Sequence, residues 1–255
     1  MTERDPWTTL REMTSARIGL GRAGGSLPTA ARLEFRLAHA AAQDAVTTEL
    51  DPQRVARGAA ELGLAVEIVT SAAADLPTYL TRPDLGRRLS DESRARLAAR
   101  GGRCDVALIV ADGLSAGAAH DEAPPLVRAL VAVLRERGLT LGPLTIATRA
   151  RVALGDEIGA LVGARAAVIL LGERPGLKSP RSLGAYLVFG PRRGRTDAER
   201  NCVSNIHPNG LATAAAARKI AWLTLAALER GLSGVALKDE EDLHVASPMF
   251  GSLPP

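Results

Sequence analysis

The chain has 255 residues, of which 46% are hydrophobic and only 3% aromatic, and its formal net charge is +4. This length allows one large domain or two small ones, with a core built mainly from Ala, Leu and Val. Nearly all of the positive charge is arginine interleaved with acids or alanines, as in "RARLAAR", so the composition does not indicate a nucleic-acid partner.

The two cysteines, Cys104 and Cys202, are far apart and have no C-x-x-C partner, which excludes a disulfide framework and zinc-site spacing. The first residues lack an apolar signal region, and no apolar run has the length of a membrane span. The sequence therefore predicts a cytoplasmic protein with no membrane partner.

The first notable segment is glycine-rich, "SARIGLGRAGGSLPT" at residues 15–29, with Gly19, Gly21 and Gly24 at G-x-G-x-x-G spacing. This spacing binds a dinucleotide only when it directly follows a buried strand and opens a helix. The preceding run contains Pro6 and several charged residues, which is a poor central strand. We therefore interpret the segment as a connector, and we reject the alternative of a nicotinamide-dependent reductase.

The next part of the chain is predicted to be helical. Residues 28–46 place Leu33, Leu37, Ala40 and Ala41 on one helical face. Residues 51–63 begin with an Asp N-cap and a Pro and end at Gly63. Residues 65–72 alternate briefly as a strand would, and Ser90 or Asp91 is the expected cap of a further helix.

From residue 105 the pattern alternates between apolar strands and amphipathic helices. Strands are expected at residues 105–112, 144–148, 165–172 and 184–190, and helices at residues 124–138, 155–164 and 213–234. Such alternation predicts an α/β fold with a Rossmann-like, mostly parallel, doubly wound sheet. We expect the sheet at about residues 104–235, preceded by a helical N-terminal region.

In an open parallel sheet, ligands bind beyond the carboxyl ends of the strands. Residues 110–117, 148–159 and 171–177 are three such strand ends, each with glycine and a polar group. Glu173 could form a salt bridge with Arg174 or accept a hydrogen bond from a ligand. Asp112 could likewise have a local structural role or bind a ligand, and the local role, a turn or a helix cap, is favoured.

Residues 194–211 are a second concentration of polar groups. Cys202 and His207, with Asn205 between them, could be imagined as a nucleophile and its base, but no family signature of cysteine enzymes surrounds them. A small polarizable side chain lining a ligand pocket is the better interpretation of Cys202. No acid/base pair, metal set or nucleophile is evident, which indicates a cofactor-holding subunit whose reaction partner is another chain.

The same stretches resemble a known family. The chain is similar to the small (light) subunit of ethanolamine ammonia-lyase, roughly from residue 10 to residue 237. Six stretches carry the resemblance in order: "TSARIGLGRAGGSLPT", "RPDLGRRL", "VADGLSA", "RVALGDEIG", "GERPGLKSPRSLGAYL" and "GRTDAERNCVSNIHPNGL".

The resemblance implies a subunit of an adenosylcobalamin-dependent radical lyase that converts ethanolamine to acetaldehyde and ammonia. In that family the large subunit is a (β/α)₈ barrel that holds the substrate, and the two subunits form a hetero-oligomer. The small subunit covers the other side of the corrin and receives its nucleotide tail. The implied cofactor contacts are Val152, Glu173 and Cys202, with no catalytic residue and no metal ligand on this chain.

Three further expectations follow from the resemblance. No D-x-H-x-x-G motif occurs, which fits a base-on cobalamin. Residues 1–103 would be an arm and helical region that contacts the large subunit through Arg17 and Arg22, residues 104–237 the cobalamin-binding domain, and residues 238–255 a polar tail.

Only fourteen residues precede Ser15, whereas some relatives carry a longer extension associated with a bacterial microcompartment, so residence in one stays open. The alternative function is a stand-alone corrinoid carrier.

Overall fold

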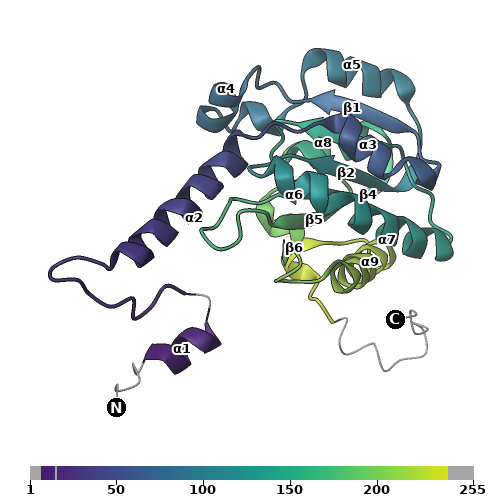
Figure 1. Ribbon diagram of the computed structural model, residues 1–255. Helices are drawn as coiled ribbons and strands as arrows, with labels where there is room; N and C mark the ends of the chain where they lie inside the picture. The colour runs from purple at the N-terminus through teal and green to yellow at the C-terminus, as the bar shows by residue number, and fades with distance from the viewer. Residues whose placement is uncertain (1–6, 15, 241–255) are drawn as a thin grey trace.

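The computed structural model describes residues 7–14 and 16–240. Within this part of the chain, six strands form one sheet in the order β1-β3-β2-β4-β5-β6 (Figure 1). The strands are β1 Val66–Thr70, β2 Cys104–Ala111, β3 Leu144–Thr148, β4 Ala164–Gly172, β5 Leu183–Phe189 and β6 Arg200–Ile206.

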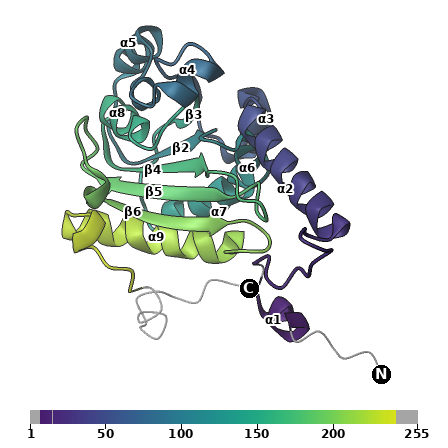
Figure 2. The ribbon, with the colours of Figure 1, turned by 90° about the vertical axis from the view of Figure 1, so that its left-hand side faces the viewer.

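Helices cover both faces of the sheet, as Figure 2 shows. One face packs against α3 Pro52–Gly58, α6 Ala116–Asp121, α7 Ala123–Glu136 and α9 Thr213–Arg230. The other face packs against α5 Asp91–Arg100 and α8 Leu154–Leu161. The remaining helices are α1 Trp7–Met13, α2 Thr29–Thr47 and α4 Leu76–Thr81. The chain is thus an α/β protein with a helical N-terminal region.

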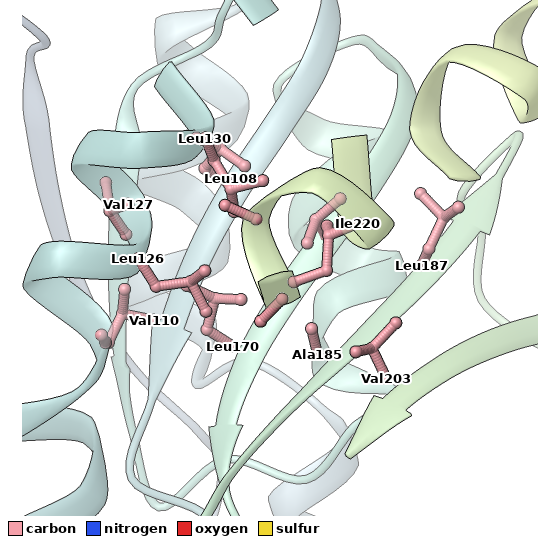
Figure 3. Packing of buried hydrophobic residues seen from close by; sticks show 14 of the residues in the cluster. Leu108, Val110, Leu126, Val127, Leu130, Leu170, Ala185, Leu187, Val203 and Ile220 are labelled. Carbon is pink, nitrogen blue, oxygen red and sulfur yellow. The ribbon is translucent and has the colours of Figure 1, made fainter. Parts of the chain in front are cut away.

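The strand β2 explains why the core has two sides. Val106, Leu108 and Val110 point into the layer of α7 and α9, where Leu126 and Ile220 also pack (Figure 3). Ala107, Ile109 and Ala111 alternate with them and face α8. A strand buried on both faces has a continuous apolar sequence, because neither side chain direction meets water. The predicted central strands and their helices are confirmed.

The sheet is mixed, with three parallel and two antiparallel pairings, so it is not strictly the doubly wound Rossmann-like sheet that was expected. β1, β3, β2 and β4 are parallel, whereas β5 runs antiparallel to β4 and β6 antiparallel to β5. The physical reason lies in the connections. The parallel strands are joined through helices, but residues 173–182 and 190–199 contain no α-helix that could carry the chain back across a face of the sheet.

Two strands are additional to the four expected between residues 105 and 190. β1 pairs with β3 along its whole length, so the sheet begins near residue 66 rather than near residue 104. β6 lies in residues 194–211, which the sequence marks only as a concentration of polar groups. It is an edge strand on which most side chains are exposed or half-buried, so its residues carry no apolar signal. The division into residues 1–103, 104–237 and 238–255 stays a prediction, and most of the last segment lies outside the described residues.

The helix α2 forms where predicted, but most of its apolar face is left exposed by the part of the chain that the structure describes. Figures 1 and 2 show α2 extending from the helical layers toward α1, which lies away from the sheet. Ala45 is its only buried residue, while Leu33 is 58% and Leu37 is 72% exposed. The predicted face is therefore present and uncovered.

Two sequence expectations about glycine and membranes can be checked directly. Gly19, Gly21 and Gly24 lie in the connector between α1 and α2, outside the sheet, so the dinucleotide fingerprint is excluded by its position. Within residues 7–14 and 16–240, no helix combines the length and apolar character needed to cross a membrane.

Candidate functional site

The carboxyl ends of the parallel strands meet at one edge of the sheet and enclose a crevice of about 330 Å³. Each of the four parallel strands, or the connection that follows it, contributes to the wall, as does β5. The lining residues are Tyr79, Gly113, Leu114, Arg151, Leu171, Gly172, Glu173, Arg174 and Tyr186. The site therefore lies where the three strand ends read from the sequence were expected to bind a ligand.

The crevice depends on close approach between the ends of β2 and β4. Leu114 donates its N–H to the carbonyl of Gly172 at 2.9 Å. Gly113 has φ +54°, and a Cβ there would lie 2.0 Å from the oxygen of Gly172. Only glycine permits this backbone contact, because any side chain would collide with the neighbouring peptide. The glycines in these strand-end stretches thus have a structural requirement.

Tyr79 of α4 joins the ends of β2 and β3 from the side. Its hydroxyl lies 2.7 Å from the carbonyl oxygen of Gly113 and 2.9 Å from that of Ala150, and its ring is buried. A buried hydroxyl needs such partners, since an unsatisfied one would be costly. Sequence reasoning missed Tyr79, because it lies in a segment broken by Pro83 and Gly86 that carries no strand pattern.

Asp112 connects the loops after β2 and β3 and does not cap a helix. Its carboxylate accepts the backbone N–H groups of Arg149 and Ala150, while Ser115 caps α6. Of the two local roles expected for Asp112, the helix cap is not observed, whereas a backbone turn is, because Ser115 donates its N–H to the carbonyl of Asp112 at 3.0 Å. Burial raises the pKa of Asp112 to about 6, although the hydrogen bonds oppose the shift. The side chain fixes the β3 loop, whose Arg149 has a positive φ of 54°.

Glu173 is held at the wall of the crevice by uncharged donors. Its carboxylate accepts the hydroxyl of Ser182 at 2.9 Å and the N–H of Asn205 at 3.4 Å. No ion pair between Glu173 and Arg174 occurs among the described residues, so the salt-bridge alternative is not the observed one. A Cβ at Gly184 would lie 2.6 Å from Oε1 of Glu173, which shows how closely the carboxylate lies over β5.

Cys202 lies beside the crevice because β6 pairs with β5. Its partner across the two strands is Tyr186, a lining residue. Cys202 is exposed as a whole, yet desolvation raises the pKa of its thiol; a hydrogen bond with Tyr186 opposes this shift and the nearby charge of Glu173 adds to it. His207 is instead paired with Asn205, at 2.8 Å between Nε2 and Oδ1. A protonated thiol with no hydrogen-bonded base does not fit a nucleophile.

The third predicted contact, Val152, is not a lining residue of the crevice. It is half-buried and packs against the core on the α8 side, directly after Arg151, which does line the crevice. The structure thus brings Glu173 and Cys202 together and places Val152 near the opposite wall. Arg151 was missed as a site residue, although it lies inside the motif "RVALGDEIG".

The described residues contain no group of three or more His, Cys, Asp or Glu side chains arranged to hold a metal ion. Among the described residues, the crevice is lined by one carboxylate, two guanidinium groups and two phenol rings. This set can bind and orient a ligand. The fold and the site together define an α/β protein with a crevice at the strand ends, which is where open sheets of this kind bind ligands.

Comparison with known proteins identifies the family. The model of the family described as ethanolamine ammonia-lyase light chain (EutC) matches residues 4–238. A protein from Rhodopseudomonas palustris (strain BisA53) named ethanolamine ammonia-lyase small subunit is 56% identical over 239 residues, covering 93% of this chain and 92% of the relative. A protein of the same name from Bradyrhizobium diazoefficiens is 52% identical over 255 residues, covering 98% of this chain and 97% of the relative. The chain belongs to the ethanolamine ammonia-lyase light-chain family and is a lyase subunit.

Proposed function

We propose that this chain is the cofactor-binding small subunit of an adenosylcobalamin-dependent ethanolamine ammonia-lyase. A large barrel subunit would hold ethanolamine and convert it to acetaldehyde and ammonia. The observation that carries the proposal is the family match over residues 4–238, with the strand-end crevice as physical support. The crevice has room for a ligand, yet residues 7–14 and 16–240 place no base next to Cys202 and no second carboxylate beside Glu173.

The residues around the crevice fit the periphery of a corrinoid. That periphery carries amide side chains, whose N–H groups are donors for a carboxylate such as Glu173. Ser182 and Asn205 already orient this carboxylate. We further propose that Cys202 and Val152 make packing contacts to the same ligand, and that the ligand keeps its own base on cobalt. The cofactor, when bound, supplies a radical by homolysis of its cobalt–carbon bond.

Replacing Glu173 with Gln tests the cofactor contact. In the complex with the large subunit, Glu173→Gln should weaken cobalamin binding about 10-fold, because a neutral amide accepts more weakly than a carboxylate. Spectral titration with cobalamin measures the affinity, and the KM for ethanolamine should stay unchanged. Glu136→Gln, at the exposed end of α7, is the matched control. An unchanged cobalamin affinity in Glu173→Gln would refute the assignment.

We also propose that the large subunit covers the N-terminal arm, meaning residues 7–47 with α1 and α2. Exposed apolar side chains occur along it, namely Trp7, Leu10, Met13, Leu27, Leu33, Phe35 and Leu37. A helix in water derives most of its stability from packing of its apolar face, which α2 does not obtain within this chain. Arg22 is exposed, whereas Arg17 donates to the carbonyl of Leu177 at 3.4 Å. A stand-alone corrinoid carrier, the alternative function, would have no use for such a surface.

A further inference from the structure

One arginine of the crevice is positioned without a carboxylate to receive it. Arg151 follows β3 and is half-buried. The carbon of its guanidinium group lies 4.2 Å from the centroid of the Tyr79 ring, and Nη2 donates to the carbonyl of Tyr79 at 3.1 Å. Stacking on a buried ring and a hydrogen bond to a backbone oxygen both restrict the guanidinium group to one orientation.

The chain behind Arg151 adds to this restriction. The N–H of Arg151 donates to the carbonyl of Gly86 at 2.8 Å. A Cβ at Gly86 would lie 2.9 Å from Cγ of Arg151 and 3.0 Å from Cε2 of Tyr79, so any larger residue would push the stacked pair apart. Arg151 is therefore fixed before any ligand arrives, which reduces the entropy lost on binding.

Some N–H donors of the Arg151 guanidinium group have no acceptor among the described residues. Its Nε is buried and makes no hydrogen bond, and Nη1 makes none to any described residue. Across residues 7–14 and 16–240, Arg151 forms no ion pair, whereas Arg94 and Arg200 are paired with carboxylates. A partly desolvated guanidinium group without a counter-charge is costly, and an anion with two oxygens would satisfy its free end.

The crevice has one carboxylate that already has hydrogen-bond donors and two arginines that could receive an anion. The only lining carboxylate, Glu173, is engaged by Ser182 and Asn205. The lining cations are Arg151 on the β3 loop and the exposed Arg174 after β4. We propose that Arg151 binds the phosphodiester of the cobalamin nucleotide tail. The inference rests on the proposed function, and it assigns to this chain the residue that neutralises the negative charge of the tail.

The test compares two corrinoids that differ in that group. Cobinamide lacks the phosphodiester, ribose and base that cobalamin carries. In the complex with the large subunit, Arg151→Gln should weaken cobalamin binding about 10- to 100-fold and change cobinamide binding less than about 2-fold. Arg151→Lys, which keeps the charge but loses the planar fork, should fall between wild type and Arg151→Gln for cobalamin. Spectral titration gives each affinity.

Arg87→Gln is the matched control, because Arg87 is an exposed arginine of the neighbouring loop that does not line the crevice. It should change neither affinity. An equal loss of cobalamin and cobinamide binding in Arg151→Gln and Arg151→Lys would overturn the inference, since it would mean that Arg151 only shapes the crevice. Unchanged cobalamin binding would also overturn it. If the wild-type complex bound neither corrinoid, the proposed function itself would fail, and this result is distinct from the other two.

Discussion

Asp112 and Asp156 are two carboxylates with different surroundings. Asp156 is buried against Arg200, which also pairs with the exposed Asp197. Asp112 has backbone N–H donors from the β3 loop and no ion-pair partner among the described residues. Burial raises the pKa of both carboxyl groups, and for Asp156 the hydrogen bond and charge of Arg200 oppose the shift. The pKa of Asp112 is about 6, so its protonation affects stability near neutral pH.

The titration of Asp112 should be visible in the pH dependence of the free energy of unfolding. Burial raises its pKa from 3.8 to about 6, so the folded state binds the proton more tightly than the unfolded state. Its contribution to stability is therefore full below about pH 4 and is lost as the pH rises through about 6. Asp112→Asn removes this titration. The free energy of unfolding of wild type minus that of Asp112→Asn should decrease by about 2 kcal/mol between about pH 4 and about pH 7.

Urea denaturation of both proteins across this pH range measures the difference. Asp121→Asn is the control, since Asp121 is exposed and paired with Arg54 and Arg181. A stability difference between wild type and Asp112→Asn that grows with pH would contradict the account, because it would mean that the fold stabilises the charged form.

At the scale of elements, the apolar pattern of the sequence predicted the strands that are buried on both faces. It did not predict the edge strand, one face of which meets water. β2 and α9 could be read from the sequence, and the stop of α9 at Gly231 agrees with its φ of +68°. β6 could not, because "RNCVSNI" reads as polar and its place at the edge of the sheet is fixed by pairing with β5. The antiparallel direction of β5 likewise depends on a connection without a helix, which strand periodicity does not encode.

The candidate site shows the same division. Glu173 and the glycines at the strand ends could be predicted, because their types and positions have a local meaning. Tyr79 and Arg151 could not be predicted as a stacked pair, since they are 72 residues apart in sequence and meet only through the fold. The helix α2 could be predicted as an element, but the sequence does not say that its apolar face lies outside the core of this chain.

The exposed face of α2 leads to a prediction at this scale. Leu33→Ser combined with Leu37→Ser should abolish or strongly reduce co-purification with the large subunit, because it removes two apolar side chains from the proposed interface. The stability of the isolated chain should change by less than about 0.5 kcal/mol, since both positions are exposed. Deleting residues 1–27 should weaken assembly as well.

The matched control combines Leu80→Ser and Val235→Ser, which are exposed apolar residues outside the arm. Co-purification should survive these substitutions. Undiminished assembly of both the Leu33/Leu37 variant and the deletion would show that the large subunit does not cover the arm.

At the scale of the molecule, the proposed function depends on two separate surfaces, the strand-end crevice and the N-terminal arm. The strand-end crevice presents a fixed carboxylate and a fixed guanidinium group, while the arm presents apolar side chains that the chain itself leaves uncovered. In the proposed function, the crevice holds the cofactor and a second chain supplies the reacting groups. Binding at the crevice and assembly through the arm are two halves of that proposal.

Reconstitution tests this central claim most directly. Acetaldehyde formation from ethanolamine is measured, with adenosylcobalamin present, for the chain alone, for its cognate large subunit alone and for the mixture. The account predicts turnover only in the mixture. Turnover by the chain alone, or a mixture no more active than the large subunit by itself, would contradict it.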